Sequence, residues 1–207
     1  MSTILERSHF AGQIESELIG REVTLCGWVH RRRDHGGVIF IDLRDRGGIA
    51  QIVFEPTHNQ KIHSLAESLR SEFVIGVRGL VRARPAGMQN SKMASGQVEL
   101  LVDDLVIFNA AQVPPFLIED EGEISENTRL KYRYLDLRRP VLQQNFILRH
   151  RMITLMRRAL DEMAFLDIET PFLTKSTPEG ARDYLVPSRM QAGHFYALPQ
   201  SPQLFKQ

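Results

Sequence analysis

The chain has 207 residues and a formal net charge of +1, with 43% hydrophobic and 25% charged residues, a composition ordinary for a soluble globular protein. Its single cysteine, Cys26, excludes an internal disulfide and a cysteine-rich zinc site. No apolar run approaches the roughly 20 residues of a membrane span, and the N-terminus lacks the basic-then-apolar order of a signal peptide. We therefore expect a cytoplasmic protein with no membrane partner, long enough for one large domain or two small ones.

The first half of the chain has the pattern of a small β-barrel. Asp45–Gly48 predicts a turn, and apolar residues at helical spacing predict a helix within His58–Ser71. Five other segments are rich in β-branched and aromatic residues and mostly alternate between apolar and polar positions: Val23–His30, Val38–Arg44, Ile49–Phe54, Phe73–Arg84 and Gln97–Phe108. Three strands, a helix and two more strands is the order of an OB-fold, although a generic α+β domain permits the same pattern.

A change in composition then marks a second region. Pro114-Pro115 lies in a stretch with few large apolar residues, which is typical of a linker. Val141–Met163 predicts a long amphipathic helix, whose apolar stripe needs cover from its own domain or from a second subunit. Phe165–Leu173 predicts a strand with Pro171 near its end, at an edge or interface position. We expect an α+β protein with a barrel at 1–110, a hinge at 111–130 and the beginning of another domain at 131–207.

Basic residues are concentrated where the second region begins. Between Arg129 and Arg158 there are nine lysines and arginines against one acid, Asp136. Such a block is either a solvated helix face or a surface for a polyanion. The second interpretation gains weight only if another part of the chain also indicates nucleic acid.

The outer face of the predicted barrel gives that indication. Alternation turns Phe40, Gln51 and Glu99 outward, and Arg31, Arg32 and Arg33 occupy the predicted loop between the first two strands. An aromatic ring can stack on an unstacked base, arginines can hold phosphates, and amides or carboxylates can read base edges. Taken alone, Phe40 could equally be a stray or covered aromatic residue. The combination favours a site for a short, defined stretch of single-stranded RNA.

The last thirty residues offer partners to a small acidic amino acid. Glu179 can accept from an ammonium group, Lys206 can pair with a carboxylate, and Ser201 and Gln203 can orient the ligand through hydrogen bonds. Alone, Pro178-Glu179-Gly180 would be an ordinary exposed turn. Its pairing with the Gln200–Gln207 string favours a pocket.

Several strings of the chain resemble bacterial-type aspartyl-tRNA synthetase, a class II aminoacyl-tRNA synthetase. The resemblance implies an anticodon-binding OB-fold followed by the start of an antiparallel α/β catalytic domain, in which a long helix and a strand ending at Pro171 form the homodimer interface. Ala164-Phe165 departs from the family's common Gly-Phe, at the turn out of that helix. The strings that carry the resemblance are Leu25–Asp34, Ile39–Arg46, Arg129–Pro140, Thr177–Arg189 and Gln200–Lys206.

The resemblance also implies roles for single residues. Phe40 would stack on the central anticodon base, Gln51 and Glu99 would contact base edges, and the three arginines would hold the RNA backbone. In the family, a histidine and a glycine at the places of His35 and Gly87 tend to accompany relaxed anticodon reading, so that both aspartate and asparagine tRNAs are charged. Neutral variation in two turns is the alternative. L-Aspartate would bind to four residues: Glu179, Ser201, Gln203 and Lys206.

The implied reaction has two steps and needs ATP and Mg²⁺. Aspartate's carboxylate attacks the α-phosphate of ATP to give aspartyl-adenylate and pyrophosphate, and the 3′-terminal adenosine of the tRNA then takes the aspartyl group. Catalysis would rest on positioning and charge stabilisation, with no covalent nucleophile and no clustered metal ligands in this chain. The second and third class II motifs, which bear the ATP-binding arginines and a magnesium carboxylate, are not recognisable within the 207 residues. We therefore expect the chain alone to bind an anticodon but not to form the adenylate.

Two other functions remain open from the sequence. One is a free-standing OB-fold RNA-binding protein, which would have no use for Glu179 and Lys206 together. The other is a synthetase-like paralogue that amidates or senses aspartate without RNA, which Phe40 and the three arginines disfavour.

Overall fold

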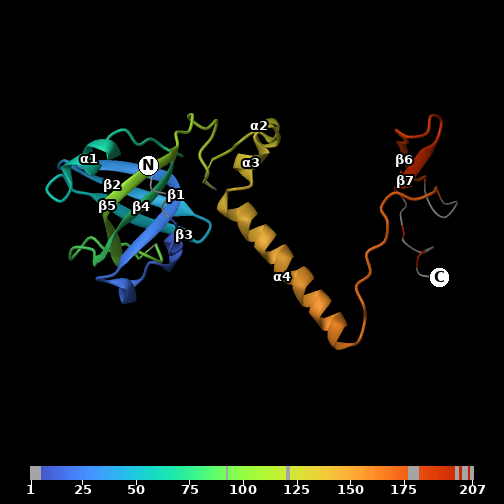
Figure 1. The fold of residues 1–207 in the computed structure, drawn as a ribbon, viewed down its shortest axis with the longest axis horizontal. Coiled ribbons are helices and arrows are strands. Elements are labelled where there is room, and N and C mark those ends of the chain that lie inside the picture. Colours follow the sequence, from blue (N-terminus) through green and yellow to red (C-terminus); the bar gives the residue numbers. More distant parts are fainter. Residues whose placement is uncertain are drawn as a thin grey trace. The chain divides into compact units, whose positions relative to one another are not determined.

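The chain forms two compact units, residues 1–117 and 118–207. The computed structural model describes residues 6–91, 93–119, 122–176 and 182–198, together with Ser201 and Phe205. Figure 1 labels the helices and strands of both units. Among the described residues, no helix is long and apolar enough to cross a membrane.

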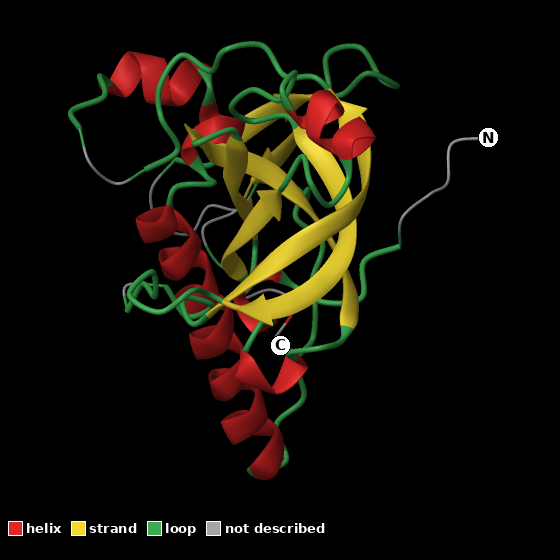
Figure 2. Ribbon diagram, turned by 90° about the vertical axis from the view of Figure 1, so that its left-hand side faces the viewer, coloured by secondary structure: helices red, strands yellow, loops and turns green. Residues whose placement is uncertain are grey.

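The first unit is a closed five-stranded β-barrel, which confirms the predicted OB-fold (Figure 1). The strands, yellow in Figure 2, are arranged in the order β1-β2-β3-β5-β4, and closure leaves no free sheet edge. All neighbours run antiparallel except β3 and β5, which are parallel. The strands are β1 (Glu22–His35), β2 (Val38–Asp45), β3 (Gly48–Phe54), β4 (Val74–Ala83) and β5 (Val98–Asn109).

Alternating apolar side chains fill the barrel, as the period-two pattern predicts. Helix α1 (Gln60–Ala66) packs its apolar side against this core through Ile62 and Ala66. Two short 3-10 helices, η1 (Ala11–Gln13) and η2 (Ser16–Leu18), precede the barrel. The fully buried inward-facing residues include Ile39, Ile41 and Leu43 of β2, Ile52 of β3 and Leu100 of β5.

The turn predicted at Asp45–Gly48 is confirmed and is held by one carboxylate. Asp45 Oδ1 accepts hydrogen bonds from the backbone N–H groups of Gly47 (2.7 Å) and Gly48 (3.1 Å), and Oδ2 accepts from the N–H of Ala11 (2.8 Å). The backbone of η1 lies so close to this turn that a Cβ on Gly12 would be 2.0 Å from the carbonyl oxygen of Gly47. The same carboxylate therefore closes the β2–β3 hairpin and fixes the N-terminal segment against it.

Strand β1 is longer than the sequence predicted. The three arginines, expected in a loop, lie within β1 and pair with β2, because Arg31 faces Asp42 and Arg33 faces Phe40. The register between the strands shifts at His30, a β-bulge of the kind that alternation alone does not predict. The prediction that the three arginines lie in a loop was therefore wrong. Only Gly36 and Gly37 separate β1 from β2.

The second unit contains the predicted long helix, now α4 (Pro140–Glu162), preceded by two short helices. Proline at its first position suits the helix start, where its missing N–H would in any case have no partner. The side chain of Ser125 caps the first short helix by accepting from the N–H of Thr128 (3.3 Å). The remaining elements are α2 (Glu126–Lys131), α3 (Arg133–Asp136), β6 (Tyr184–Pro187) and β7 (Phe195–Leu198), of which β6 and β7 form an antiparallel hairpin.

The strand predicted at Phe165–Leu173 is absent from the structure, where these described residues have no regular secondary structure. A strand needs a neighbour for its backbone groups, and the segment finds one only at its end, where Thr174 bridges to Ala197. Pro171 has no N–H to donate. The apolar side chains of the segment are therefore largely exposed to solvent; Phe172, for example, is 86% exposed.

A buried carboxylate joins the three helices of the second unit. Asp136 has no exposed surface and accepts from Arg129 (3.1 Å), Arg133 (2.7 Å) and Arg139 (3.4 Å). Burial alone would raise the pKa of the Asp136 carboxyl, but the hydrogen bonds and charges of these arginines lower it below its ordinary value of 3.8. The basic block of the sequence is therefore partly organised around its only acid.

We expect Asp136→Asn to weaken this cluster, because three arginines lose their shared counter-charge. Since the folded pKa is lowered, the carboxylate's contribution to stability is present above its unfolded pKa and is lost as the pH falls through the folded pKa. Amide-exchange protection factors over residues 129–143 should be lower in the variant at neutral pH, and the difference should disappear as the pH falls through the lowered pKa of Asp136 in the folded chain. The exposed Asp161, changed to Asn, is the control and should alter neither value; a pH-independent difference would contradict the assignment.

Candidate nucleic-acid interface

One outer face of the barrel carries a connected set of polar side chains around a single aromatic ring. Backbone register places their positions side by side: Arg33 pairs with Phe40, Asp42 with Gln51, and Arg82 with Glu99. We call this set the polar face; its members are Arg31, Arg33, Phe40, Asp42, Gln51, Arg82 and Glu99.

Hydrogen bonds connect the polar face across four strands. Arg33 Nη2 donates to Asp42 Oδ1 (2.6 Å) and to Gln51 Oε1 (3.3 Å), and Gln51 Nε2 donates to Glu99 Oε2 (2.8 Å). A guanidinium can only donate and a carboxylate only accept, so these two partners fix which end of the Gln51 amide faces which neighbour. The amide therefore has one defined orientation before any ligand arrives.

Glu99 is the buried centre of this network, with only 2% of its surface exposed. Its Oε1 accepts from Arg82 Nε (2.9 Å), and Arg82 Nη2 also donates to Glu55 Oε1 (2.5 Å). Burial alone would lower the pKa of Arg82, but hydrogen bonds with Glu55 and Glu99 raise it above its ordinary value. The guanidinium of Arg82 is therefore held beside one oxygen of Glu99, with Gln51 occupying the other carboxylate oxygen.

Three members of this arrangement were missed by the sequence reasoning: Asp42, Glu55 and Arg82. Asp42 lies two residues after Phe40, so alternation turns it outward as well, but its acidic side chain gave no signal of a role in the site. A signal for Arg82 existed in the β4–β5 pairing, because residues directly opposite each other on one face interact, but it needed the exact register. Phe40 is half-buried, so its ring is partly available to a ligand.

The bulge at His30 separates the three arginines. Arg31 and Arg33 pair with Asp42 and Phe40 and share their outer face, whereas Arg32 pairs with the core residue Ile41 and so turns to the opposite side. There Arg32 lies 3.7 Å from Asp34. The structure thus brings two of the three predicted arginines to the polar face.

The two predicted selectivity residues lie in two different turns. His35 ends β1, opposite Val38, immediately before the Gly36-Gly37 turn. Gly87, with a φ of +82°, follows β4 in a turn where its N–H donates to Gln89 Oε1 (3.0 Å). A left-handed φ of this size favours glycine.

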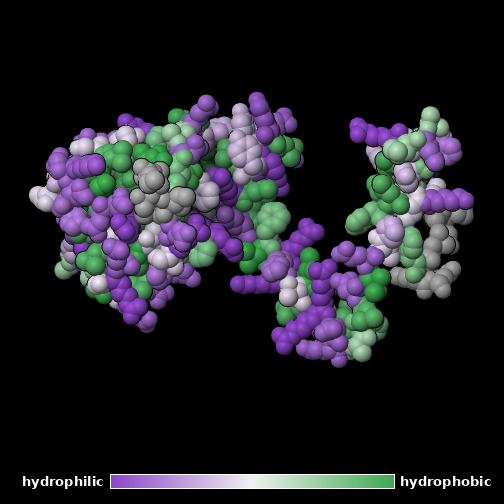
Figure 3. All heavy atoms as spheres, in the orientation of Figure 1, coloured by the Kyte–Doolittle hydropathy of each residue, from purple (hydrophilic) through white to green (hydrophobic). Residues whose placement is uncertain are grey.

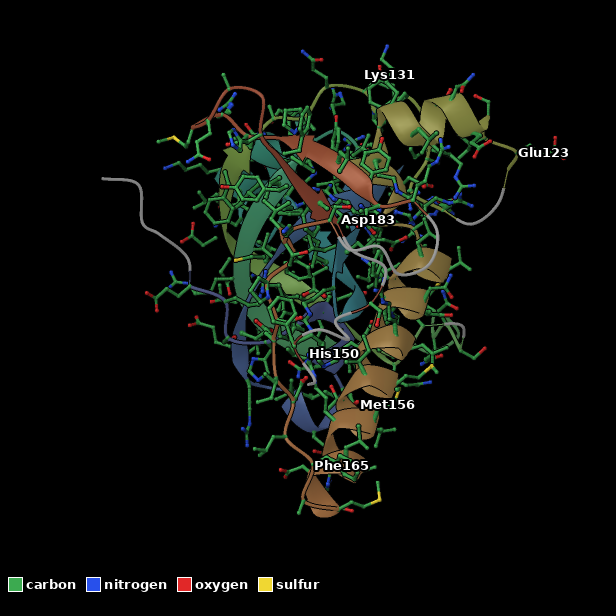
Figure 4. The ribbon with its side chains drawn as sticks, turned by 90° about the vertical axis from the view of Figure 1, so that its right-hand side faces the viewer. Glu123, Lys131, His150, Met156, Phe165 and Asp183 are labelled. Carbon is green, nitrogen blue, oxygen red and sulfur yellow. The ribbon has the colours of Figure 1, made fainter. Side chains whose placement is uncertain are left out.

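Most of the predicted aspartate pocket lies outside the described residues, namely Glu179, Gln203 and Lys206. Ser201 is described and is exposed. Ser176 Oγ donates to Asp183 Oδ2 (3.0 Å); Figure 4 labels Asp183. Among the described residues, no group of three or more His, Cys, Asp or Glu side chains could hold a metal ion.

The long helix presents an uncovered apolar surface. No residue of α4, the whole of which is described, is buried, and Met156 and Phe165 are each 62% exposed (Figure 4). Hydrophobic residues, green in Figure 3, lie on the surface of this helix and the segment after it. They line a groove of about 650 Å³ formed by Ile153, Met156, Leu160, Phe165 and Leu166 among others. Pro171, the predicted interface residue, is exposed in the same segment.

Comparison with known proteins assigns both units. Residues 23–108 match the model of an OB-fold nucleic acid binding domain, and residues 125–207 match that of the class II tRNA synthetases for D, K and N. The aspartate–tRNA(Asp/Asn) ligase of Desulfotalea psychrophila is 61% identical over 98% of this chain and 33% of that protein. The ligase of the same name from Syntrophotalea carbinolica is 60% identical over 98% of this chain and 34% of that protein.

The chain belongs to the class II tRNA synthetases. It spans about a third of the length of the curated relatives that it matches. Among solved structures, asparaginyl-tRNA synthetase from Pyrococcus horikoshii with asparaginyl-adenylate aligns with a TM-score of 0.79 and 26% identity, over 97% of this chain and 44% of that one. Aspartyl-tRNA synthetase from Entamoeba histolytica has the same fold, with a TM-score of 0.72 at 21% identity over 86% of this chain and 42% of that one.

We expect Arg82→Leu to lower the free energy of unfolding of this synthetase barrel by about 3 kcal/mol, because it leaves the Glu99 carboxylate buried without its cation. Adding Glu99→Gln should recover most of the loss, since an amide keeps a partner for Gln51 without a buried charge. Urea unfolding followed by the barrel's circular dichroism measures both variants.

The matched control for Arg82 is Arg78→Leu on the same strand, whose partner Asp104 is 3.4 Å away in a largely exposed pair. Its cost should be under about 1 kcal/mol. Equal losses for Arg78→Leu and Arg82→Leu would contradict the central place of Glu99.

Proposed function

We propose that the chain is part of an aspartate–tRNA ligase and that its polar face binds the anticodon. The observation that carries the proposal is the fixed network around Glu99: it presents one aromatic ring beside oriented amide, carboxylate and guanidinium groups. Relatives about 60% identical over nearly the whole chain are named aspartate–tRNA(Asp/Asn) ligases, which supports the same reading.

Each member of the face has a physical task in this proposal. Phe40 stacks on an unstacked anticodon base. Gln51 uses its remaining N–H and lone pair to read a base edge. A direct contact of Glu99 with a base edge rests on the resemblance alone, because this residue is 2% exposed and its two oxygens accept from Gln51 and Arg82. Arg31 and Arg33 hold phosphates. Arg32 belongs to the proposed set through the resemblance alone, because pairing turns it to the opposite side.

The amino-acid end of the proposal rests on the resemblance in the second unit. Glu179, Ser201 and Gln203 would orient the amino group of L-aspartate, and Lys206 would pair with its side-chain carboxylate. A lysine selects against asparagine, because a desolvated cation facing a neutral amide loses its ion pair. Class II synthetases use ATP and Mg²⁺, and among the described residues no group of three or more His, Cys, Asp or Glu side chains could hold the metal.

The assembly and organisation follow the same proposal. The uncovered stripe of α4, with the segment around Pro171, forms a homodimer interface. Residues 1–110 form the anticodon module, 111–130 the hinge and 131–207 the start of the catalytic domain. The tRNA substrate is tRNA-Asp. His35 and Gly87 relax anticodon reading, so that tRNA-Asn is charged as well. The enzyme is cytoplasmic. A free-standing OB-fold RNA-binding protein is the alternative, and the match of residues 125–207 to a synthetase model disfavours it.

Phe40→Ala should weaken binding of an anticodon stem-loop to this chain by roughly tenfold or more, because base stacking on an aromatic ring contributes about 1–3 kcal/mol. Fluorescence anisotropy with a labelled RNA hairpin measures the affinity. Phe108→Ala is the matched control, since this exposed phenylalanine lies at the end of β5, outside the polar face. Equal affinity of the Phe40 variant and the original chain would remove the proposed stacking site.

His35→Leu should reduce charging of tRNA-Asn more than charging of tRNA-Asp, if this residue relaxes anticodon reading. The measurement compares kcat/KM for the two tRNAs in a full-length ligase that contains this chain. The ratio of the two values, rather than either value, tests selectivity, because a general loss of activity cancels. An unchanged ratio would refute the role of His35.

A further inference from the structure

Hydrogen bonds connect the N-terminal end of helix α1 to the barrel. The side chain of Asn59 caps the helix by accepting from the N–H of Ile62 (3.2 Å) and donates to the carbonyl oxygen of Asp103 in β5 (3.1 Å). His58 Nε2 lies 2.5 Å from Asp103 Oδ1. With Ala66 fully buried in the core, the helix has little freedom to shift on the barrel.

From this fixed helix, His63 reaches the turn between β1 and β2. Its Nε2 lies 2.8 Å from the carbonyl oxygen of Gly37, and only 7% of the residue is exposed. Because a carbonyl can only accept, Nε2 carries the proton, and in the neutral ring Nδ1 is then an acceptor. Nδ1 is buried and has no hydrogen-bond partner among the described residues. A buried polar atom without a partner costs free energy, so packing alone gives no reason to place a histidine here.

The turn that His63 contacts consists of two glycines. Gly36 and Gly37 both have left-handed φ values, +61° and +80°, which suit a two-residue hairpin. No described atom lies within 4 Å of the place where a side chain of either glycine would begin. Glycine loses more backbone freedom on ordering than any other residue, so a contact from outside the hairpin changes how well this turn is defined.

The turn leads directly into the polar face. Counting along the hairpin from Gly36-Gly37, the first pair is His35 with Val38, the second Asp34 with Ile39, and the third Arg33 with Phe40. A change in the turn's conformation therefore reaches the stacking residue and its neighbouring arginine within three pairs.

We infer that His63 is a positioning residue for the anticodon site: its Nε2–H bond to Gly37 fixes the β1–β2 turn and, through it, Arg33 and Phe40. The inference rests on the proposed function of the polar face and adds a residue from outside that face. His63 does not touch RNA in this arrangement. It raises the fraction of molecules whose site is already formed, and apparent affinity scales with that fraction. Loss of one net hydrogen bond predicts a loss of affinity of about fivefold.

The test compares variants that separate the hydrogen bond from the packing. His63→Leu removes the donor and also the unpartnered nitrogen, so we expect the barrel to remain folded. His63→Gln can place an amide N–H near the position of Nε2 and keep the bond to Gly37. His194→Leu is the matched control, since it removes an exposed histidine whose ring also lies near a backbone carbonyl oxygen, that of Ala192 (3.2 Å), but in the second unit and not at the β1–β2 turn.

Each variant of the 207-residue chain is titrated with labelled stem-loops that carry the aspartate or the asparagine anticodon. We expect affinity to fall about fivefold in His63→Leu, to recover in His63→Gln and to stay within about twofold in His194→Leu. Equal binding by His63→Leu and the original chain overturns the inference and leaves the proposed function intact. Absence of binding by the original chain overturns both.

A second measurement does not depend on RNA or on the folding of a variant. Nitrogen-15 NMR of the original chain reports which ring nitrogen of His63 carries the proton. The inference expects the neutral ring to carry its proton on Nε2 and not on Nδ1, together with Gly36 and Gly37 amide signals that shift in His63→Leu more than in His63→Gln. A ring protonated on Nδ1 alone cannot donate to Gly37 and overturns the inference.

Discussion

The buried carboxylate of Glu99 is the constraint on which the polar face depends. An ionised group with 2% exposure is tolerated only with a cation and hydrogen bonds close by, and Arg82 and Gln51 supply them. Meeting that requirement fixes the orientation of the Gln51 amide, which in turn accepts from Arg33. The groups that face a ligand are therefore ordered by an electrostatic demand inside the protein before the ligand binds.

The second unit also compensates a buried carboxylate, but with residues that are close in sequence. Asp136 is fully buried, and three arginines from the basic block surround it within a short stretch of chain. In the barrel, by contrast, the groups come from several strands and are brought together by strand pairing, above all by the parallel pairing of β3 with β5. Local sequence therefore contains most of the Asp136 cluster, whereas the Glu99 network exists only in the complete fold.

That difference explains how far sequence reasoning reaches. Alternation in β2 was enough to assign Ile41 to the core and Phe40 to the outside, because the side-chain period of a strand is two. Alternation could not predict the bulge at His30, because it assumes a constant period of two. The extra residue at the bulge changes the face of every residue after it. Arg82 required the β4–β5 register, and the bond from His63 to Gly37 joins residues 26 apart. The failed strand at Phe165–Leu173 shows that composition does not supply a pairing partner.

Order before binding suits the recognition of a short, defined sequence. A surface for any single strand uses several aromatic rings in a basic groove and tolerates movement, because every base has a face on which to stack. The polar face has one ring, Phe40, beside groups whose donors and acceptors are already assigned, so a base with the wrong edge would leave a desolvated partner unsatisfied. Discrimination then depends on how little the site can adjust, which makes the glycine turn of the β1–β2 hairpin its weakest part. The hydrogen bond from helix α1 to that turn lies outside the polar face, so it can reduce the freedom of the turn without occupying the surface that we propose for RNA.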